Sequence, residues 1–373
     1  ERGKMKVLIL SCDTGQGHNS AARAVFEAFD RRGNVCEMFD PLTLGRKKSA
    51  HIVSATYSGM LRKAPAVFGV LYRAGDIYSS TGITSPIYRA NTHYADSLRE
   101  YITSNSFDAV VSTHLFSMEA LTAIRRKPDF HVPCFGVLTD YTRIPFFAET
   151  DLDGYFIPHD DLMDEMTVKG MPEERIFATG IPVSARFANH TDKDEAREIL
   201  GIPHDIPAIL VMSGGVGCGH IVNLCREFLK KNDTDFVLRV LTGKNTAMKK
   251  EIDETFGGDG RIQTVPFTER VNLYMNASDV MISKPGGLTS TEAAVANIPL
   301  VHLLAYTGCE TKNIEFFSER GISLRAGNIK DAVHCAWNLI DDKSLADSMR
   351  EMQRKYIAPD AADRIVSKVI SYV

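Results

Sequence analysis

Short, nearly continuous apolar runs alternate along the chain with segments of helical periodicity. The first run, residues 5–12 (MKVLILSC), ends in a turn with two glycines, and residues 18–32 then place apolar side chains at helical spacing. Buried strands that alternate with helices predict parallel sheets with crossover helices, which is an α/β fold. Comparable runs predict further strands at residues 108–113, 133–139, 154–157, 208–212, 236–241, 279–283 and 299–304.

The pattern begins again after residues 179–182 (TGIP), which predicts two doubly wound domains in tandem. We expect an N-terminal domain over residues 5–182 and a second domain over residues 183–345. Residues 346–373 have the pattern of C-terminal helices, which we place at the junction of the two domains. A length of 373 residues agrees with two domains of about 100–200 residues each.

Composition and charge exclude several classes of protein. The net charge is −4 and 44% of the residues are hydrophobic, so nucleic-acid binding gains no support. The seven cysteines are scattered without the spacing of a metal site, and we expect reduced thiols and no bound metal. No apolar stretch approaches the roughly 20 residues that span a bilayer. We therefore expect a cytoplasmic protein.

One segment departs from this charge balance. Between Pro41 and Arg99 there are eight basic residues and two acidic ones, a local charge of +6. Apolar and aromatic side chains are interleaved with them, which is typical of a surface at lipid headgroups. A helical subdomain with a solvated basic face is the alternative. The residues expected to contact an anionic membrane surface or a lipid acceptor are Arg46, Lys47, Lys48, Arg62, Lys63, Phe68 and Tyr72.

The first glycine turn, residues 13–20 (DTGQGHNS), follows a predicted strand and opens a helix. Its glycines allow a ligand to approach the backbone, and the N–H groups at the helix start favour an anion. A dinucleotide site is one interpretation, although Ser20 stands where the third glycine is expected. That interpretation leaves His18 unexplained. A histidine that donates to a nearby carbonyl at the helix start is the structural alternative.

Two further glycine-rich turns follow strands of the second domain. Residues 213–220 (SGGVGCGH) are not a Walker A loop, and residues 243–245 (GKN) lack its Ser or Thr. Residues 283–292 (SKPGGLTSTE) open a helix, where Thr289 and Glu292 also fit a capping box. Two such turns at the carboxyl ends of strands would aim two helix N-termini into one crevice, which suits a diphosphate.

The order of these motifs resembles the glycosyltransferase family that contains plant monogalactosyldiacylglycerol synthase, bacterial diacylglycerol glucosyltransferases and the peptidoglycan enzyme that makes lipid II. The similarity extends over nearly the full chain, and the segment SKPGGLTSTEA looks like the family's donor-binding motif position by position. The resemblance implies a GT-B fold: two facing Rossmann-like domains, with a last helix that crosses back to the first. It also implies inverting transfer from a nucleotide sugar without a bound metal.

Site residues follow from the same resemblance. His18 matches the histidine of the acceptor-side loop, as base or as a group that orients the acceptor, and Asp13 and Asp140 are further catalytic candidates. Glu292 matches the acid that holds the ribose hydroxyls. Residues 141–147 (YTRIPFF) replace a stretch that contains His and Trp in many relatives, which leaves the acceptor open. The implied donor-binding residues are Gly15, Gly17, Gly215, Val216, Gly217, Gly286, Gly287, Thr289, Glu292, Glu310 and Asn313.

The function predicted from these motifs is transfer of glucose or galactose from a UDP-sugar to diacylglycerol or a glycosyldiacylglycerol. We expect the enzyme to work at the inner face of the cell membrane, with the UDP-sugar as co-substrate and no cofactor. One alternative is transfer to another lipid or to a soluble acceptor, and another is a sugar-nucleotide epimerase. A catalytically silent nucleotide-binding module would keep Glu292 and the glycine turns without needing His18.

Overall fold

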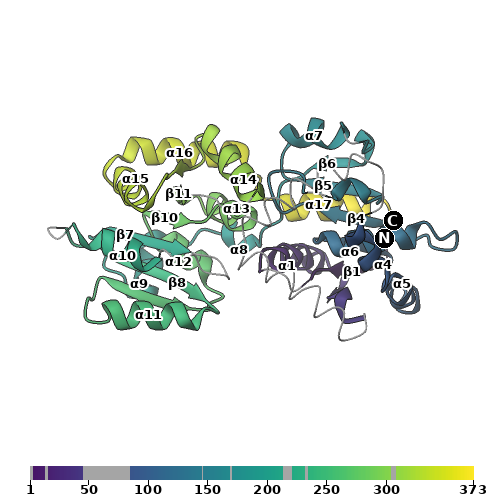
Figure 1. Ribbon diagram of the computed structural model, residues 1–373, viewed down its shortest axis with the longest axis horizontal. Helices are drawn as coiled ribbons and strands as arrows, with labels where there is room; N and C mark the ends of the chain where they lie inside the picture. The colour runs from purple at the N-terminus through teal and green to yellow at the C-terminus, as the bar shows by residue number, and fades with distance from the viewer. Residues whose placement is uncertain are drawn as a thin grey trace. The chain divides into compact units, whose positions relative to one another are not determined.

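The structure is a computed structural model, which describes residues 3–12, 16–44, 85–144, 146–168, 170–212, 221–231, 234–303 and 308–373. It divides into two compact units. The first comprises Glu1–Ser184, Thr307–Cys309 and Pro359–Val373, and the second comprises Ala185–Tyr306 and Glu310–Ala358. In the described part of each unit, six parallel strands form one sheet with helices packed against it (Figure 1). The two sheets define an α/β fold.

The first sheet has the strand order β2-β1-β3-β4-β5-β6. Its strands are β1 (Lys6–Leu10), β2 (Val35–Phe39), β3 (Ala109–Ser112), β4 (Cys134–Val137), β5 (Gly154–Ile157) and β6 (Ile176–Ala178). The helices of this unit are α1 (Gln16–Arg31), α4 (Pro86–Thr92), α5 (Ala95–Ser104), α6 (Leu115–Arg125), α7 (Met163–Thr167) and α17 (Ala361–Ile370), with short 3-10 turns at Pro41–Leu44, Phe147–Glu149, Asp160–Leu162 and Glu173–Arg175.

Strand β1 shows how this sheet is buried on both faces. Its side chains alternate between the faces, as they must in a strand. Leu8 and Leu10 join the apolar cluster that includes α5 and α6, whereas Val7 and Ile9 join the cluster that includes α1 and α17. The last helix of the chain, α17, therefore packs in the first unit, against α1 (Figure 1).

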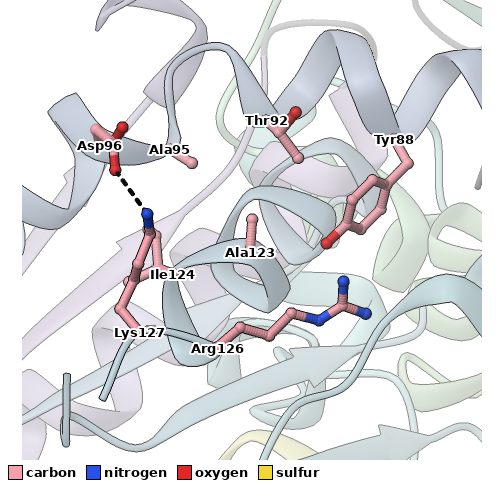
Figure 2. Close-up of a pocket in the computed structure, with 8 residues that line it drawn as sticks. All are labelled: Tyr88, Thr92, Ala95, Asp96, Ala123, Ile124, Arg126 and Lys127. Atoms are coloured by element: carbon pink, nitrogen blue, oxygen red, sulfur yellow. Dashed lines mark ion pairs between the residues drawn. The ribbon is translucent and has the colours of Figure 1, made fainter. Parts of the chain in front are cut away.

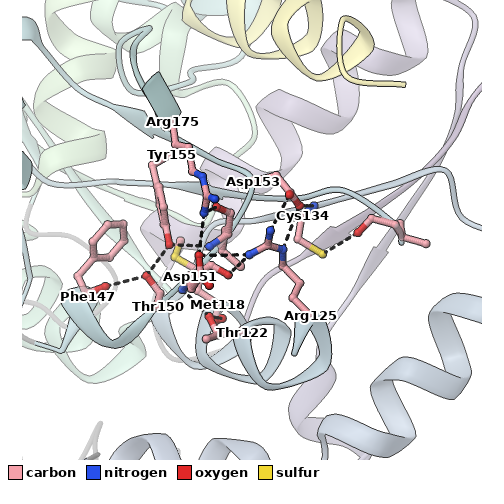
Figure 3. Close-up of polar contacts among 12 residues, drawn as sticks. Met118, Thr122, Arg125, Cys134, Phe147, Thr150, Asp151, Asp153, Tyr155 and Arg175 are labelled. Atoms are coloured by element: carbon pink, nitrogen blue, oxygen red, sulfur yellow. Dashed lines mark hydrogen bonds and ion pairs between the residues drawn. The ribbon is translucent and has the colours of Figure 1, made fainter. Parts of the chain in front are cut away.

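A polar network fixes the end of α6 to the sheet (Figure 3). Arg125 Nε and Nη2 donate to the two carboxylate oxygens of Asp153, at 3.1 and 2.6 Å. Asp153 also accepts from the backbone N–H of Cys134, at the start of β4. Asp151 accepts from Arg175 Nη1 at 2.8 Å, and its backbone N–H donates to Thr122 of α6. Because charge-assisted bonds are the stronger ones, this network holds α6 firmly beside β4 and β5.

The second sheet has the order β12-β11-β10-β7-β8-β9. Its strands are β7 (Ala208–Met212), β8 (Val237–Gly243), β9 (Ile262–Pro266), β10 (Val280–Ser283), β11 (Leu300–His302) and β12 (Leu324–Arg325). The helices of this unit are α8 (Ala185–Ala188), α9 (Lys193–Leu200), α10 (Ile221–Leu229), α11 (Thr246–Phe256), α12 (Val271–Ala277), α13 (Gly287–Val295), most of α14 (Gly308–Glu319), α15 (Ile329–Asp341) and α16 (Lys343–Tyr356).

The C-terminal helices, which we expected to form one segment over residues 346–373, belong to two different units. Helix α16 begins at Lys343 and lies in the second unit, where it packs against α13 and α15. Gln353, fully buried on α16, donates to the carbonyl of Ile298 at 2.8 Å. Only α17 belongs to the first unit, and the first long segment of that unit ends at Ser184 rather than at residue 182.

Candidate functional site

The strand order places the predicted loops at the reversal point of each sheet. In the first sheet, β2 lies on one side of β1 and β3 on the other, so the order reverses beside β1. In the second sheet, β7 lies between β8 and β10 in the same way. Open parallel sheets bind ligands at this point, outside the carboxyl ends of the strands. Met212 of β7 is paired with Ser283 of β10, so these two strands end at the same edge of the sheet.

His18 lies in the first turn of α1, which follows β1, and the residue after β3 holds it. Its Nδ1 lies 2.8 Å from the carbonyl oxygen of Thr113, and Thr113 Oγ1 donates back to the His18 carbonyl at 3.0 Å. Thr139, which follows β4, places its Oγ1 3.1 Å from the same Nδ1. Because a carbonyl only accepts, Nδ1 carries the ring proton, and Nε2 of the neutral ring is the unprotonated nitrogen.

This geometry reconciles the two interpretations of His18. The structural alternative, a histidine that donates to a carbonyl at a helix start, describes Nδ1 correctly. The same bond leaves Nε2 as a proton acceptor, and no described residue donates a hydrogen bond to it. A base fixed in one tautomer by its other nitrogen is a recurring arrangement in catalysis.

Burial and one carboxylate act on His18 in opposite directions. Burial lowers the pKa of His18 from its ordinary value of 6.5, whereas the Asp140 carboxylate and the bond to Thr113 raise it. The ring is therefore neutral at neutral pH, as a general base requires. The structure thus brings two predicted residues, His18 and Asp140, together at the ends of β1 and β4. The other catalytic candidate, Asp13, lies outside the described residues, as does Gly15, while Gly17 lies in the first turn of α1.

A second histidine, His114, was not predicted. It is 4% exposed and meets the His18 ring edge-on, with 4.6 Å between the ring centroids. Its Nδ1 accepts from the N–H of Phe116 at 3.2 Å and so caps α6. Burial, and then the charge of His18, keep the pKa of His114 well below its ordinary value. The available signal was its position directly after the apolar run 108–113, at the same sheet edge as the first glycine turn.

In the second unit, the predicted donor motif forms the start of α13. Gly286 is the N-cap and makes no side-chain cap, so the capping-box interpretation of Thr289 and Glu292 is wrong. The helix begins earlier than that interpretation requires, and Thr289 lies inside the first turn. The first intrahelical bond runs from the N–H of Ser290 to the carbonyl of Gly286, at 2.9 Å. The N–H groups of residues 287–289 precede it and remain available to an anion.

Glu292, on the next turn of α13, is an acid in unusual surroundings. Burial raises the pKa of Glu292 to about 7, and Arg186 only partly opposes this effect. No hydrogen bond joins its carboxylate to any residue that the structure describes. Glu292 keeps some exposed surface, so its carboxylate is partly desolvated, and a ligand with hydrogen-bond donors would replace the hydration it has lost. Two vicinal hydroxyl groups would do so.

Glu310 and Asn313 lie near this turn on α14. Glu310 forms an ion pair with Lys284, at 2.9 Å between Nζ and Oε1. Asn313 is fully buried and donates to the carbonyl of Pro285 at 2.9 Å, so it holds the turn that precedes α13. The structure therefore brings together the predicted residues Gly286, Gly287, Thr289, Glu292, Glu310 and Asn313, whereas Gly215, Val216 and Gly217 lie outside the described residues.

Most of the basic segment also lies outside the described residues, including all seven of its predicted contact residues. Its described end contains both buried and exposed residues, and the basic Arg89 is exposed. Tyr88 is 6% exposed, and Arg99 pairs with Asp129 at 2.9 Å. Tyr88 lines a pocket of about 240 Å³ among α4, α5 and α6, where its ring lies beside the Arg126 side chain (Figure 2). None of the predicted site residues lines this pocket.

The described residues contain no group of three or more His, Cys, Asp or Glu side chains placed to hold a metal ion. None of their helices combines the length and the apolar character needed to cross a membrane.

Comparisons with known proteins agree with the fold. MurG of Acinetobacter baumannii superposes with a TM-score of 0.64 at 16% identity, over 99% of this chain and 100% of that one. The MnaA–UDP structure from S. aureus gives 0.67 at 17% identity, over 99% and 96%. The chain therefore has the GT-B fold.

Family models and relatives define the class. Residues 18–183 match the model described as monogalactosyldiacylglycerol (MGDG) synthase, and residues 208–309 match the glycosyltransferase family 28 C-terminal domain. The fold and these two domains are those of a GT-B glycosyltransferase. Processive diacylglycerol beta-glucosyltransferases of Bacillus licheniformis and Bacillus subtilis are each 24% identical, over 98% of this chain and 94% of theirs. The chain is thus similar, over nearly its whole length, to MGDG synthases and diacylglycerol glucosyltransferases.

Proposed function

We propose that this protein transfers a hexose, glucose or galactose, from a UDP-sugar to the hydroxyl of diacylglycerol or a glycosyldiacylglycerol, with inversion at the anomeric carbon. The observation that carries this proposal is the fixed tautomer of His18, whose Nδ1 donates to Thr113 and whose Nε2 can accept a proton. The matching MGDG synthase domain and the names of the Bacillus relatives support a lipid acceptor.

In this mechanism the acceptor oxygen attacks the anomeric carbon on the face opposite the diphosphate. The bond from that carbon to the diphosphate oxygen breaks, and UDP leaves with the electron pair. The acceptor proton passes to Nε2 of His18, whose pKa is lowered by burial and held up in part by Asp140. A general base of this kind contributes about 10²- to 10⁴-fold to the rate.

On the donor side we assign the diphosphate to the N–H groups at the start of α13 and the ribose hydroxyls to Glu292. Helix N-termini stabilise negative charge because the first N–H groups have no intrahelical partner. Glu292 would accept two hydroxyl bonds, which would replace the water it loses on burial. We expect transfer without a resident metal as part of this proposal.

Membrane attachment is a second part of the proposal, and it rests on the basic segment. Each basic side chain near an anionic surface adds about 1 kcal/mol of attraction. We expect vesicle binding to rise with anionic lipid, to fall with salt, and to weaken when Arg46, Lys47, Lys48, Arg62 and Lys63 are replaced by glutamine. Equal, salt-insensitive binding to neutral and anionic vesicles would contradict electrostatic attachment.

The deciding experiment measures UDP release from UDP-glucose and UDP-galactose, with and without diacylglycerol vesicles, and mass spectrometry of the lipid fraction. Release that depends on lipid, together with a glycosyldiacylglycerol product, is the expected result. His18→Asn serves as the matched variant, since it should lose about 10²- to 10⁴-fold in kcat while keeping UDP affinity. UDP release without a lipid adduct would point to another acceptor or to an epimerase, and binding without release would indicate a silent module.

A further inference from the structure

The two residues that follow β3, Thr113 and His114, contact His18 directly. Thr113 bonds the ring nitrogen through its carbonyl and the backbone through its hydroxyl, at 2.8 and 3.0 Å. The next residue, His114, lays its ring edge-on against the His18 ring at 4.6 Å. Two consecutive residues thus fix the hydrogen-bonding, the tautomer and the packing of one imidazole.

His114 is itself held by several bonds. Its Nδ1 accepts from Phe116 N–H, and its carbonyl accepts from the hydroxyls of Ser112 and Ser117, each at 3.0 Å. The far end of α6 is fixed by the pairing of Arg125 with Asp153. The His114 ring is therefore a rigid surface rather than a mobile neighbour.

We propose that His114 is a positioning residue for His18, whose ring fixes the orientation of the base and excludes water from it. This inference rests on the proposed role of His18 as the base. The alternative is purely structural: His114 would serve only to cap α6, a task that serine or asparagine performs as well.

The groups that act on the protonation of His18 lie in the segments that follow β3 and β4. Asp140, after β4, favours the protonated ring, and His114, before α6, contributes to the burial that disfavours it. Because His114 binds a proton less readily than His18, it stays neutral when His18 titrates and acts through burial rather than charge. Removal of its ring should admit water and raise the pKa of His18 toward 6.5.

Two substitutions separate the two roles of His114. His114→Asn keeps an N-cap acceptor and removes the ring, whereas His114→Phe keeps a ring and removes the cap. We expect His114→Asn to keep the thermal midpoint and to lower kcat roughly 10- to 100-fold with little change in KM. The apparent pKa of the acid limb of its kcat/KM profile should rise. We expect His114→Phe to keep the acid limb and to lower the thermal midpoint.

The pKa of His18 should also be measured directly, by NMR titration of histidine-labelled protein, with His18→Asn used to assign the signal. This measurement needs no turnover, so it remains informative if the proposed transferase activity fails. A raised pKa of His18 in His114→Asn, and an unchanged one in His114→Phe, would support the positioning role. An unchanged acid limb and pKa in a folded His114→Asn variant would overturn it and leave His114 as a helix cap.

Discussion

Glu292 offers a test in which protein stability and ligand binding should change in opposite directions. Burial raises the pKa of Glu292 from 4.5 to about 7, so the folded protein binds more protons than the unfolded chain between these values. The free energy of unfolding therefore falls as the pH rises through this window, and the loss is complete above pH 7. The difference corresponds to about 3 kcal/mol. Since the residue keeps some exposed surface, we expect about 1–3 kcal/mol.

Glu292→Gln removes the ionisation and should recover this stability. At pH 8 the thermal midpoint of the variant should exceed that of the wild type by roughly 2–10 °C, and near pH 4.5 the two should agree. UDP-glucose affinity at pH 8 should fall about 10- to 100-fold, because a charged acceptor of hydroxyl bonds is lost. Calorimetric unfolding and titration measure the two effects, with Glu319→Gln, an exposed change on α14, as the control.

Either half of this expectation can fail separately. Equal midpoints at pH 8, or a difference that does not depend on pH, would refute the argument from burial. A stabilised variant with unchanged UDP-glucose affinity would show that the acid is buried but does not serve the nucleotide. In the wild type, affinity for UDP-glucose should also decline as the pH falls below about 7, since the protonated carboxyl accepts the ribose hydroxyls less well.

Three other substitutions test how the site is supported. Arg125→Met leaves the half-buried Asp153 without its partner, and calorimetry should show a loss of about 2–4 kcal/mol, part of which Asp153→Asn restores in the double variant. Burial raises the pKa of Glu119 to about 8, so ionisation of this carboxyl destabilises the folded protein. The wild type should therefore lose stability as the pH rises through about 8, and Glu119→Gln should abolish that loss. Asn313→Ala removes the bond to the Pro285 carbonyl. It should weaken both the free energy of unfolding and the free energy of UDP-glucose binding by about 1–2 kcal/mol each.

The central strands could be predicted from the sequence, whereas four others could not. Residues 154–157 and 208–212 were predicted with the bounds that β5 and β7 have in the structure. The strands without a prediction are β2, β6, β9 and β12, which are the outermost strands of the two sheets. An outer strand is covered on fewer sides, and each of these four contains partly exposed positions. Their segments therefore lack the continuous apolar run that marks a buried parallel strand.

Prediction of the site had a similar limit. A glycine turn after an apolar run shows where a ligand approaches a sheet, and this was enough to locate His18 and the start of α13. The tautomer of His18 depends on Thr113, which is 95 residues away, and the pKa of Glu292 depends on burial by the folded unit. Contacts of this kind leave no periodic pattern in the sequence. The capping pattern of Thr289 and Glu292 was misleading because it is purely local. It does not take into account that the preceding turn ends at Gly286, where the helix is already capped.

The titratable groups at these loops indicate a ligand site more clearly when they are considered together than when each is considered alone. His18, His114 and Glu292 all have pKa values displaced by burial, and all follow strands beside the reversal point of a sheet. Burial of such groups lowers stability unless a bonded partner offsets it. His18 has its bond to Thr113 and the favourable charge of Asp140, but the described residues offer Glu292 only the charge of Arg186. Under the proposed function the ribose hydroxyls would supply the partner that Glu292 lacks, so this acid supports the proposed nucleotide site more strongly than the glycines beside it.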